Sequence, residues 1–172
     1  MIPFSIVNSF ERTYPRVLSF FEKVRQNEGA TIPVGAVGFC WGGKHVIHLA
    51  HGATASGDGG GKPLVDAVFT GHPSLLKLPA DVEPVRKPLS IAVGDKDIWL
   101  TAKGVETVRR VFAGLTSPTE LTVYPNAGHG FTVRQDKTNP EQERQAKEAQ
   151  AQALEWFAQH FATVNYTASA SA

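Results

Sequence analysis

The chain has 172 residues, enough for one domain that buries roughly 70% of the surface its unfolded form exposes. Its 17 basic and 16 acidic residues leave a net charge of +1. This excludes a strong positive electrostatic potential that would attract nucleic acid or an anionic membrane. One cysteine excludes an internal disulfide and a structural zinc site built from several cysteines, so a reducing compartment suits the chain best.

No secretory signal or membrane span is recognisable, because the N-terminus lacks a basic and apolar leader and no apolar run approaches about 20 residues. We therefore expect a cytoplasmic protein with one domain over 1–162 and a flexible tail at 163–172. The glycine-rich stretch 53–62 is interpreted as a surface loop without a chemical role.

The predicted elements alternate between helices and strands. Apolar residues at three- and four-residue spacing predict a first amphipathic helix over 14–26. Short runs of branched and aromatic residues predict strands at 34–39, 64–70, 89–93 and 121–124. Further helices are predicted over 44–51, 101–115 and 139–161. This alternation indicates an α/β fold, a mostly parallel sheet of about four or more strands flanked by helices.

Ligands of open parallel sheets bind beyond the carboxyl ends of the strands, so the residues that follow each strand are the first candidates for a site. In chain order these residues are Cys40, His72, Asp97 and His129.

The segment 38–43, Gly-Phe-Cys-Trp-Gly-Gly, follows a predicted buried strand and opens a helix. This is the context of a nucleophile elbow, Gly-x-nucleophile-x-Gly, with a thiol at its centre. The sharp turn strains the nucleophile, and we expect side chains at 38 and 42 to collide with neighbouring elements. The helix N-terminus favours a thiolate at Cys40, and the Trp41 backbone N–H is expected in an oxyanion hole. In the alternative, Cys40 is a small buried hydrophobe.

Two carboxylates and a histidine follow the later strands. Asp95 and Asp97 come just after the third strand, where a catalytic triad needs an acid that orients an imidazole. His129 lies between glycines after the fourth strand, on a loop expected to be accessible. Taken singly, each aspartate could merely stabilise its turn through hydrogen bonds to the backbone, and the histidine could be a loop residue without a catalytic role. Their order after Cys40, nucleophile then acid then histidine, is that of α/β-hydrolases.

These motifs together, Gly-Phe-Cys-Trp-Gly-Gly, Gly-Asp-Lys-Asp and Asn-Ala-Gly-His-Gly-Phe, resemble the dienelactone hydrolase family over roughly 34–161. The resemblance implies an α/β-hydrolase fold and hydrolysis of lactone or ester carbonyls without a cofactor. By motif position it implies Cys40 as nucleophile, His129 as general base and acid, and Asp97 as the acid that fixes the imidazole. Asp95 is the less favoured acid.

The resemblance also implies a pocket for a small lactone or ester. His72, in a Gly-His-Pro-Ser segment, resembles a histidine segment that lines the pocket in fungal-type members, and packing is its alternative role. Trp99 matches an aromatic pocket position. Arg134 lies one residue later than the carboxylate-binding arginine of bacterial members. His45, His48 and His51 lack a carboxylate partner and the spacing of a zinc helix, so no metal site is predicted.

Family members resemble a longer chain in which several strands precede the elbow and carry the second oxyanion donor. The residues before position 34 predict one helix and no strand. We therefore expect an N-terminally truncated version of the fold, in which the elbow strand has an unpaired edge that invites association with another copy. Loss of one oxyanion donor typically lowers turnover about 10² to 10³-fold. The alternatives to an enzyme are an impaired homologue with a binding or assembly role, and a redox-sensitive thiol at Cys40.

Overall fold

Four parallel strands form one sheet in the order in which they occur along the chain. They are β1 (Gly35–Phe39), β2 (Ala67–Gly71), β3 (Leu89–Lys96) and β4 (Thr119–Gly128). The structure is a computed structural model that describes residues 7–55 and 61–166. A parallel sheet flanked by helices confirms the predicted fold class. Within the described residues no strand pairs with the outer edge of β1, which is an end strand.

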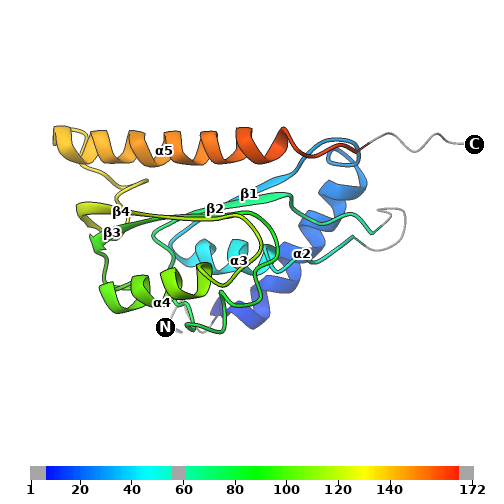
Figure 1. The fold of residues 1–172 in the computed structure, drawn as a ribbon, viewed down its shortest axis with the longest axis horizontal. Coiled ribbons are helices and arrows are strands. Elements are labelled where there is room, and N and C mark those ends of the chain that lie inside the picture. The colour runs from blue at the N-terminus through cyan, green and yellow to red at the C-terminus, as the bar shows by residue number, and fades with distance from the viewer. Residues whose placement is uncertain (1–6, 56–60, 167–172) are drawn as a thin grey trace, which may run out of the picture.

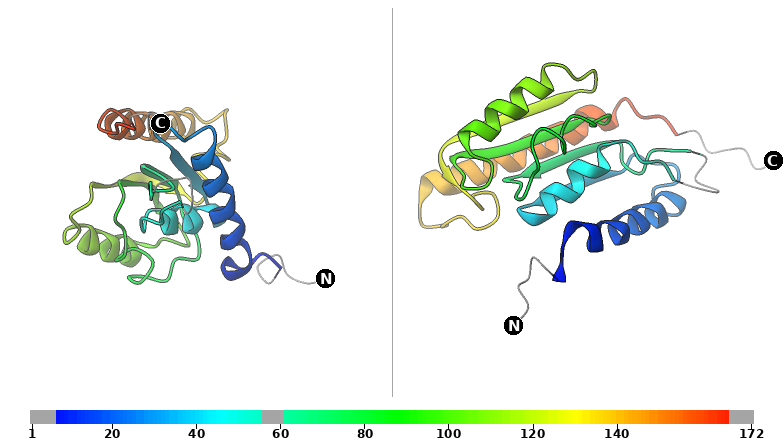
Figure 2. Two further views of the ribbon diagram at one scale, coloured as in Figure 1. Left: turned by 90° about the vertical axis from the view of Figure 1, so that its right-hand side faces the viewer. Right: turned by 90° about the horizontal axis from the view of Figure 1, so that it is seen from below.

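The strand order explains which face each helix covers. When every strand is added on the same side of the previous one, right-handed crossovers place all the connections on one face of the sheet. Helix α3 (Trp41–Leu49) and helix α4 (Ala102–Phe112) lie there, together with α2 (Phe10–Gln26), which precedes β1 (Figure 1). Viewed from that face, α4, α3 and α2 lie side by side (Figure 2). The opposite face is left for α5 (Pro140–Phe161), which follows the last strand.

The core is therefore divided into two layers by the sheet. On the face covered by α2, α3 and α4, the fully buried side chains include Ile47, Leu49 and Ile91. On the α5 face, Phe69 and Tyr124 pack with partly buried Phe157 from the helix. Both sides of the sheet are covered, as the apolar strand sequences predict. None of the described helices is both long enough and apolar enough to cross a membrane.

The helix boundaries reflect capping and tertiary packing. Asn139 caps α5 because its side chain accepts hydrogen bonds from the Glu141 and Gln142 N–H groups, and Pro140 follows in the first turn. Helix α2 begins at Phe10, four residues before its predicted start. The centroid of the Phe10 ring lies 4.3 Å from that of the His48 ring on α3. This contact between distant residues is not visible in the local sequence pattern.

A buried ion pair ties α2 to the beginning of the sheet. Arg25 is 1% exposed, and its guanidinium lies 2.8 Å from Asp66 Oδ2 just before β2. The same carboxylate oxygen accepts the Val34 N–H just before β1. Of the predicted tail, residues 167–172 lie outside the described part, whereas Tyr166 hydrogen-bonds to Asp66. Of the predicted glycine-rich loop, residues 56–60 likewise lie outside it.

Candidate active site

The register of the sheet decides which side chains meet beyond its carboxyl edge. Phe39 of β1 pairs with Gly71 of β2, so the next residues, Cys40 and His72, leave the sheet side by side. At the other side of the sheet, Lys96 of β3 pairs with Gly128 of β4. The residues that follow this pair are Asp97 and His129. The four candidates thus arrive as two adjacent pairs, one from each pair of strands.

Cys40 occupies the strained turn that the elbow motif predicts. Its φ is 50° and its ψ is −119°. A positive φ of this size is one that residues other than glycine rarely adopt. The segment after β2 holds this turn in place, because the Cys40 carbonyl accepts the Ser74 N–H at 2.9 Å and the Cys40 N–H donates to the Gly71 carbonyl. The Cys40 side chain is half-buried, so the alternative of a sealed, purely hydrophobic cysteine does not describe it.

The elbow glycines have different roles. A Cβ at Gly38 would lie 2.5 Å from the Gly42 carbonyl oxygen, a backbone atom that cannot move away, so the prediction for position 38 is confirmed. A Cβ at Gly42 would meet nothing within 4 Å, so the prediction for position 42 is wrong. The tight position on the helix is instead Gly43, where a Cβ would lie 2.6 Å from Thr70 Oγ1.

We expect Gly38→Ala to lower the free energy of unfolding by about 1–3 kcal/mol, because the added methyl group overpacks the turn. Gly42→Ala is the matched control, since it adds the same methyl group to open space in a helix, where alanine is favoured over glycine. Urea unfolding of both variants checks this. Equal destabilisation by the two changes would contradict the steric explanation.

Asp97 and His129 form a buried acid–imidazole pair. Asp97 is 4% exposed, and its Oδ2 lies 2.9 Å from His129 Nδ1. Its other oxygen, Oδ1, accepts the backbone N–H groups of Trp99 and Leu100, at 2.7 and 3.1 Å. The carboxylate is therefore held in one orientation, and it in turn holds the imidazole. His129 Nε2 lies 3.3 Å from Ser74 Oγ.

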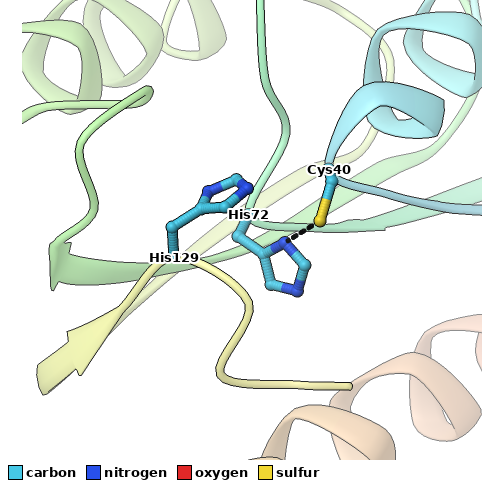
Figure 3. Close-up of side chains that lie close together, drawn as sticks. All are labelled: Cys40, His72 and His129. Atoms are coloured by element: carbon cyan, nitrogen blue, oxygen red, sulfur yellow. Dashed lines mark hydrogen bonds between the residues drawn. The ribbon is translucent and has the colours of Figure 1, made fainter. Parts of the chain in front are cut away.

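The thiol of Cys40 contacts a different histidine. Its Sγ is hydrogen-bonded to His72 Nδ1 at 3.3 Å, and His72 Nε2 is hydrogen-bonded to Thr132 Oγ1 at 2.7 Å. Burial, with the nearby His129, lowers the pKa of His72 to about 4, so this ring is neutral near neutral pH. Among the described residues, no hydrogen bond joins Cys40 to His129, but one ligand atom from each of Cys40, His72 and His129 lies within 4.8 Å of the other two. Figure 3 shows the three side chains converging from three segments.

The other predicted pocket residues lie around this cluster. Arg134 is exposed, and its Nη2 lies 3.7 Å from Cys40 Sγ. Trp41 is the first residue of α3, so its N–H belongs to the first helical turn beside the thiol. Trp99 is 51% exposed and, together with Trp41 and Leu75, lines a hollow of about 470 Å³ on the α3 side. Arg134 therefore contacts the sulfur directly, and the hollow is lined by Trp41, the residue that follows Cys40.

Asp95 and the α3 histidines are placed apart from this chemistry. Asp95 lies within β3 rather than after it and is exposed, whereas Asp97 follows the strand and is buried against His129. The expectation that the α3 histidines lack a carboxylate partner is wrong for His48, whose Nε2 lies 3.0 Å from Asp81 Oδ1. Asp81 is in the loop between β2 and β3, distant in sequence, so the local pattern does not reveal it. Lys44 binds the other oxygen of the same carboxylate at 3.0 Å. This network attaches α3 to the loop that leads into β3.

Two site residues were missed by sequence reasoning. Ser74 contacts His129, and Thr132 contacts His72, so each histidine has a hydroxyl neighbour. Both hydroxyls lie within three residues of a predicted site histidine, on the loops that follow β2 and β4. That proximity was the available signal, but hydroxyl residues are frequent in loops and nothing local distinguishes these two.

Comparison with known proteins identifies relatives of this chain. The sequence model of the Dienelactone hydrolase family matches residues 8–161. The hydrolase tropI of Talaromyces stipitatus is 31% identical over 125 residues, which are 72% of this chain and 44% of that protein. A provisionally named carboxymethylenebutenolidase of Salmonella typhimurium is 32% identical over 145 residues, covering 78% of this chain and 49% of its own length.

Solved structures of dienelactone hydrolases are also similar to this chain, over part of their own length. A provisionally identified dienelactone hydrolase from Klebsiella pneumoniae superposes with a TM-score of 0.57 and 27% identity, covering 73% of this chain and 51% of that one. Dienelactone hydrolase from Anabaena variabilis, at 18% identity, shares the fold with a TM-score of 0.61 over 89% of this chain and 62% of its own. The chain spans about half the length of the curated relatives that it matches. With its α/β-hydrolase-type sheet and this sequence match, the chain belongs to the dienelactone hydrolase family.

Proposed function

We propose that the protein hydrolyses a lactone or ester through a thioester on Cys40, with His129 as base and Asp97 as the acid that orients it. The observation that carries the proposal is the Asp97–His129 pair, 2.9 Å apart and within 4.8 Å reach of a thiol on a strained elbow. A nucleophile, a base and a group that orients the base are the three parts that covalent acyl transfer requires. Family membership supports the same chemistry.

The reaction begins when Cys40 Sγ turns from His72 toward His129, whose Nε2 takes the thiol proton. The thiolate adds to the carbonyl carbon, and the Trp41 N–H stabilises the oxyanion of the tetrahedral intermediate. When the intermediate collapses, the alkoxide leaves and takes the proton from His129. Water then gives a proton to His129 and its oxygen to the thioester carbon, which releases the acid and restores the thiol.

The residues around the thiol are assigned to substrate binding. Arg134 is an exposed cation 3.7 Å from the sulfur, which suits a substrate with a carboxylate near its scissile bond. Trp99 offers an apolar surface in the adjacent hollow. His72 is neutral near neutral pH and holds the sulfur before substrate enters. The single cysteine supports a reducing, cytoplasmic setting, and the reaction needs no cofactor.

The test is to follow an activated ester such as p-nitrophenyl acetate with the unmodified chain, recording both phenolate release and the mass of the protein. The proposal expects repeated turnovers and a transient acyl group on Cys40. An acyl group that stays on the thiol would instead favour the impaired homologue with a binding role. Peroxide sensitivity of Cys40 without turnover would favour a redox thiol.

We also propose that a second copy of the chain associates through the outer edge of β1. Val37, at the centre of this strand, is 49% exposed, and large apolar side chains flank it on both faces: Phe20 on α2 is 60% exposed and Leu154 on α5 is 62% exposed. A groove of about 650 Å³ runs between the β1 edge and α5 and is lined by Val37, Phe157 and Leu154. Pairing β1 with β1 of a second copy gives hydrogen-bond partners to the backbone groups of the edge. It also covers the exposed apolar side chains on both faces of the sheet in a symmetric way.

Sedimentation equilibrium over a range of concentrations is expected to show a monomer–dimer equilibrium. Val37→Lys places a charge on the edge strand and should shift the chain to the monomer. Ile98→Lys is the matched control, because Ile98 is 75% exposed but follows β3, away from this edge, and it should leave the association unchanged. A wild-type chain that stays monomeric at the highest concentration would contradict the proposal.

A further inference from the structure

Three metal-binding side chains from three separate segments converge at the carboxyl edge of the sheet. Cys40 comes from the elbow, His72 from the loop after β2 and His129 from the loop after β4 (Figure 3). One sulfur and two imidazole nitrogens, one from each residue, lie within 4.8 Å of one another. Acyl transfer needs one histidine as base, which is His129 in the proposed mechanism, so His72 takes no proton-transfer step in that chemistry.

The remaining ring nitrogens have the partners that metal-bound histidines usually have. His129 uses Nδ1 for the Asp97 carboxylate, which leaves Nε2 for a ligand once the ring gives up its 3.3 Å contact with the Ser74 hydroxyl. His72 uses Nε2 for the Thr132 hydroxyl, which leaves Nδ1, the atom already 3.3 Å from the sulfur. Hydrogen bonds of this kind fix the ring orientation and raise the basicity of the nitrogen that binds the metal. Both rings are thus held in orientations that present a lone pair.

The separations are close to those of a tetrahedral zinc site. With Zn–S near 2.3 Å and Zn–N near 2.0–2.1 Å, tetrahedral geometry separates a sulfur from a nitrogen by about 3.6 Å and two nitrogens by about 3.3 Å. The Cys40–His72 distance of 3.3 Å is about 0.3 Å shorter than the tetrahedral sulfur–nitrogen separation, and movement within the half-buried side chains of Cys40 and His129 brings in the third ligand. Thiolate and imidazole together favour zinc over harder cations such as Mg²⁺.

One group opposes a cation at this position. Arg134 Nη2 lies 3.7 Å from the sulfur and would repel the metal. Its side chain is exposed and free to turn into solvent, whereas the Asp97 carboxylate is buried and remains behind His129. The thiolate and Asp97 together balance the two charges of the metal, because binding displaces the thiol proton into solvent.

We propose that Cys40, His72 and His129 form a reversible Zn²⁺ site, with a fourth position open to water. Occupation binds both the sulfur and the lone pair of His129, so the metal and an acyl substrate exclude one another. Zinc is then an inhibitor of the esterase, a consequence that rests on the proposed function. The binding itself does not, because it requires only the three ligands.

The experiment titrates the chelator-treated chain with ZnCl₂ in competition with a chromophoric zinc indicator. CoCl₂ titrations provide a second readout, because cobalt bound to a thiolate has a charge-transfer absorption band. One zinc per chain is expected. Cys40→Ser and His72→Gln should each weaken zinc binding about 100-fold or more, since loss of an outer partner alone costs 10- to 100-fold. The cobalt–thiolate band should be absent in Cys40→Ser.

His48→Gln is the matched control, because His48 lies with His51 and Asp81 in the other histidine cluster among the described residues. It should leave the zinc affinity unchanged. No zinc binding, or binding that survives Cys40→Ser and His72→Gln, would overturn the proposal. Zinc binding in a chain without esterase turnover would overturn the proposed function and leave the metal site standing. Near-UV circular dichroism of each variant shows whether a loss reflects unfolding.

Discussion

Cys40→Ala is expected to reduce turnover of an activated ester by about 10⁴-fold or more, because the thiol that forms the covalent intermediate is lost. His72 and His129 could still act as bases toward water, but without a thiol the acyl group has no acceptor on the elbow. Steady-state phenolate release and mass spectrometry of the acylated chain measure the two effects together.

The structure also predicts how the fold responds to this change. The Cys40 backbone, rather than its sulfur, makes the hydrogen bonds to Gly71 and Ser74 that hold the elbow. Loss of the sulfur should therefore leave the unfolding midpoint in urea close to that of the wild type. Turnover that persists in a folded Cys40→Ala chain would mean that hydrolysis takes place elsewhere on the molecule.

Asp97→Asn is expected to lower kcat about 10⁴-fold while leaving the position of the imidazole almost unchanged. The carboxamide oxygen can still accept the N–H groups of Trp99 and Leu100, as Oδ1 does now. The amide NH₂ then faces His129 Nδ1 and donates to it. His129 must carry its proton on Nε2, which is the nitrogen that has to accept the thiol proton.

Asp95→Asn is the matched control, since it makes the same chemical change two residues earlier, near the end of β3. Asp95 is exposed, and the change should alter kcat by less than about threefold, in keeping with the small effects of surface substitutions. A pH profile of kcat/KM separates a lost base from a lost fold. Equal losses in the two variants would show that negative charge near the end of β3 matters, rather than the tautomer of His129.

The types of the elements were predictable from the sequence, because hydrophobic periodicity reports local burial. Several of their boundaries were not predictable. Leu64 and Val65 are each 1% exposed and were predicted to begin the second strand, yet β2 begins at Ala67. Burial alone does not make a strand, which also requires pairing. Conversely, β4 runs from Thr119 to Gly128, past the predicted end at 124, because pairing with β3 continues through a bulge. At that bulge a Cβ on Gly94 would lie 2.0 Å from the Ala127 carbonyl oxygen.

The sequence by itself determined which residues stand at the ends of strands, because turn glycines and apolar runs are local signals. It placed Cys40 on an elbow and Asp97 and His129 beyond later strands in the right order. Only the tertiary structure decided which of these side chains touch. Strand register pairs Phe39 with Gly71 and Lys96 with Gly128, and so it joins Cys40 to His72 and Asp97 to His129. Register depends on contacts between distant segments, which no local pattern encodes.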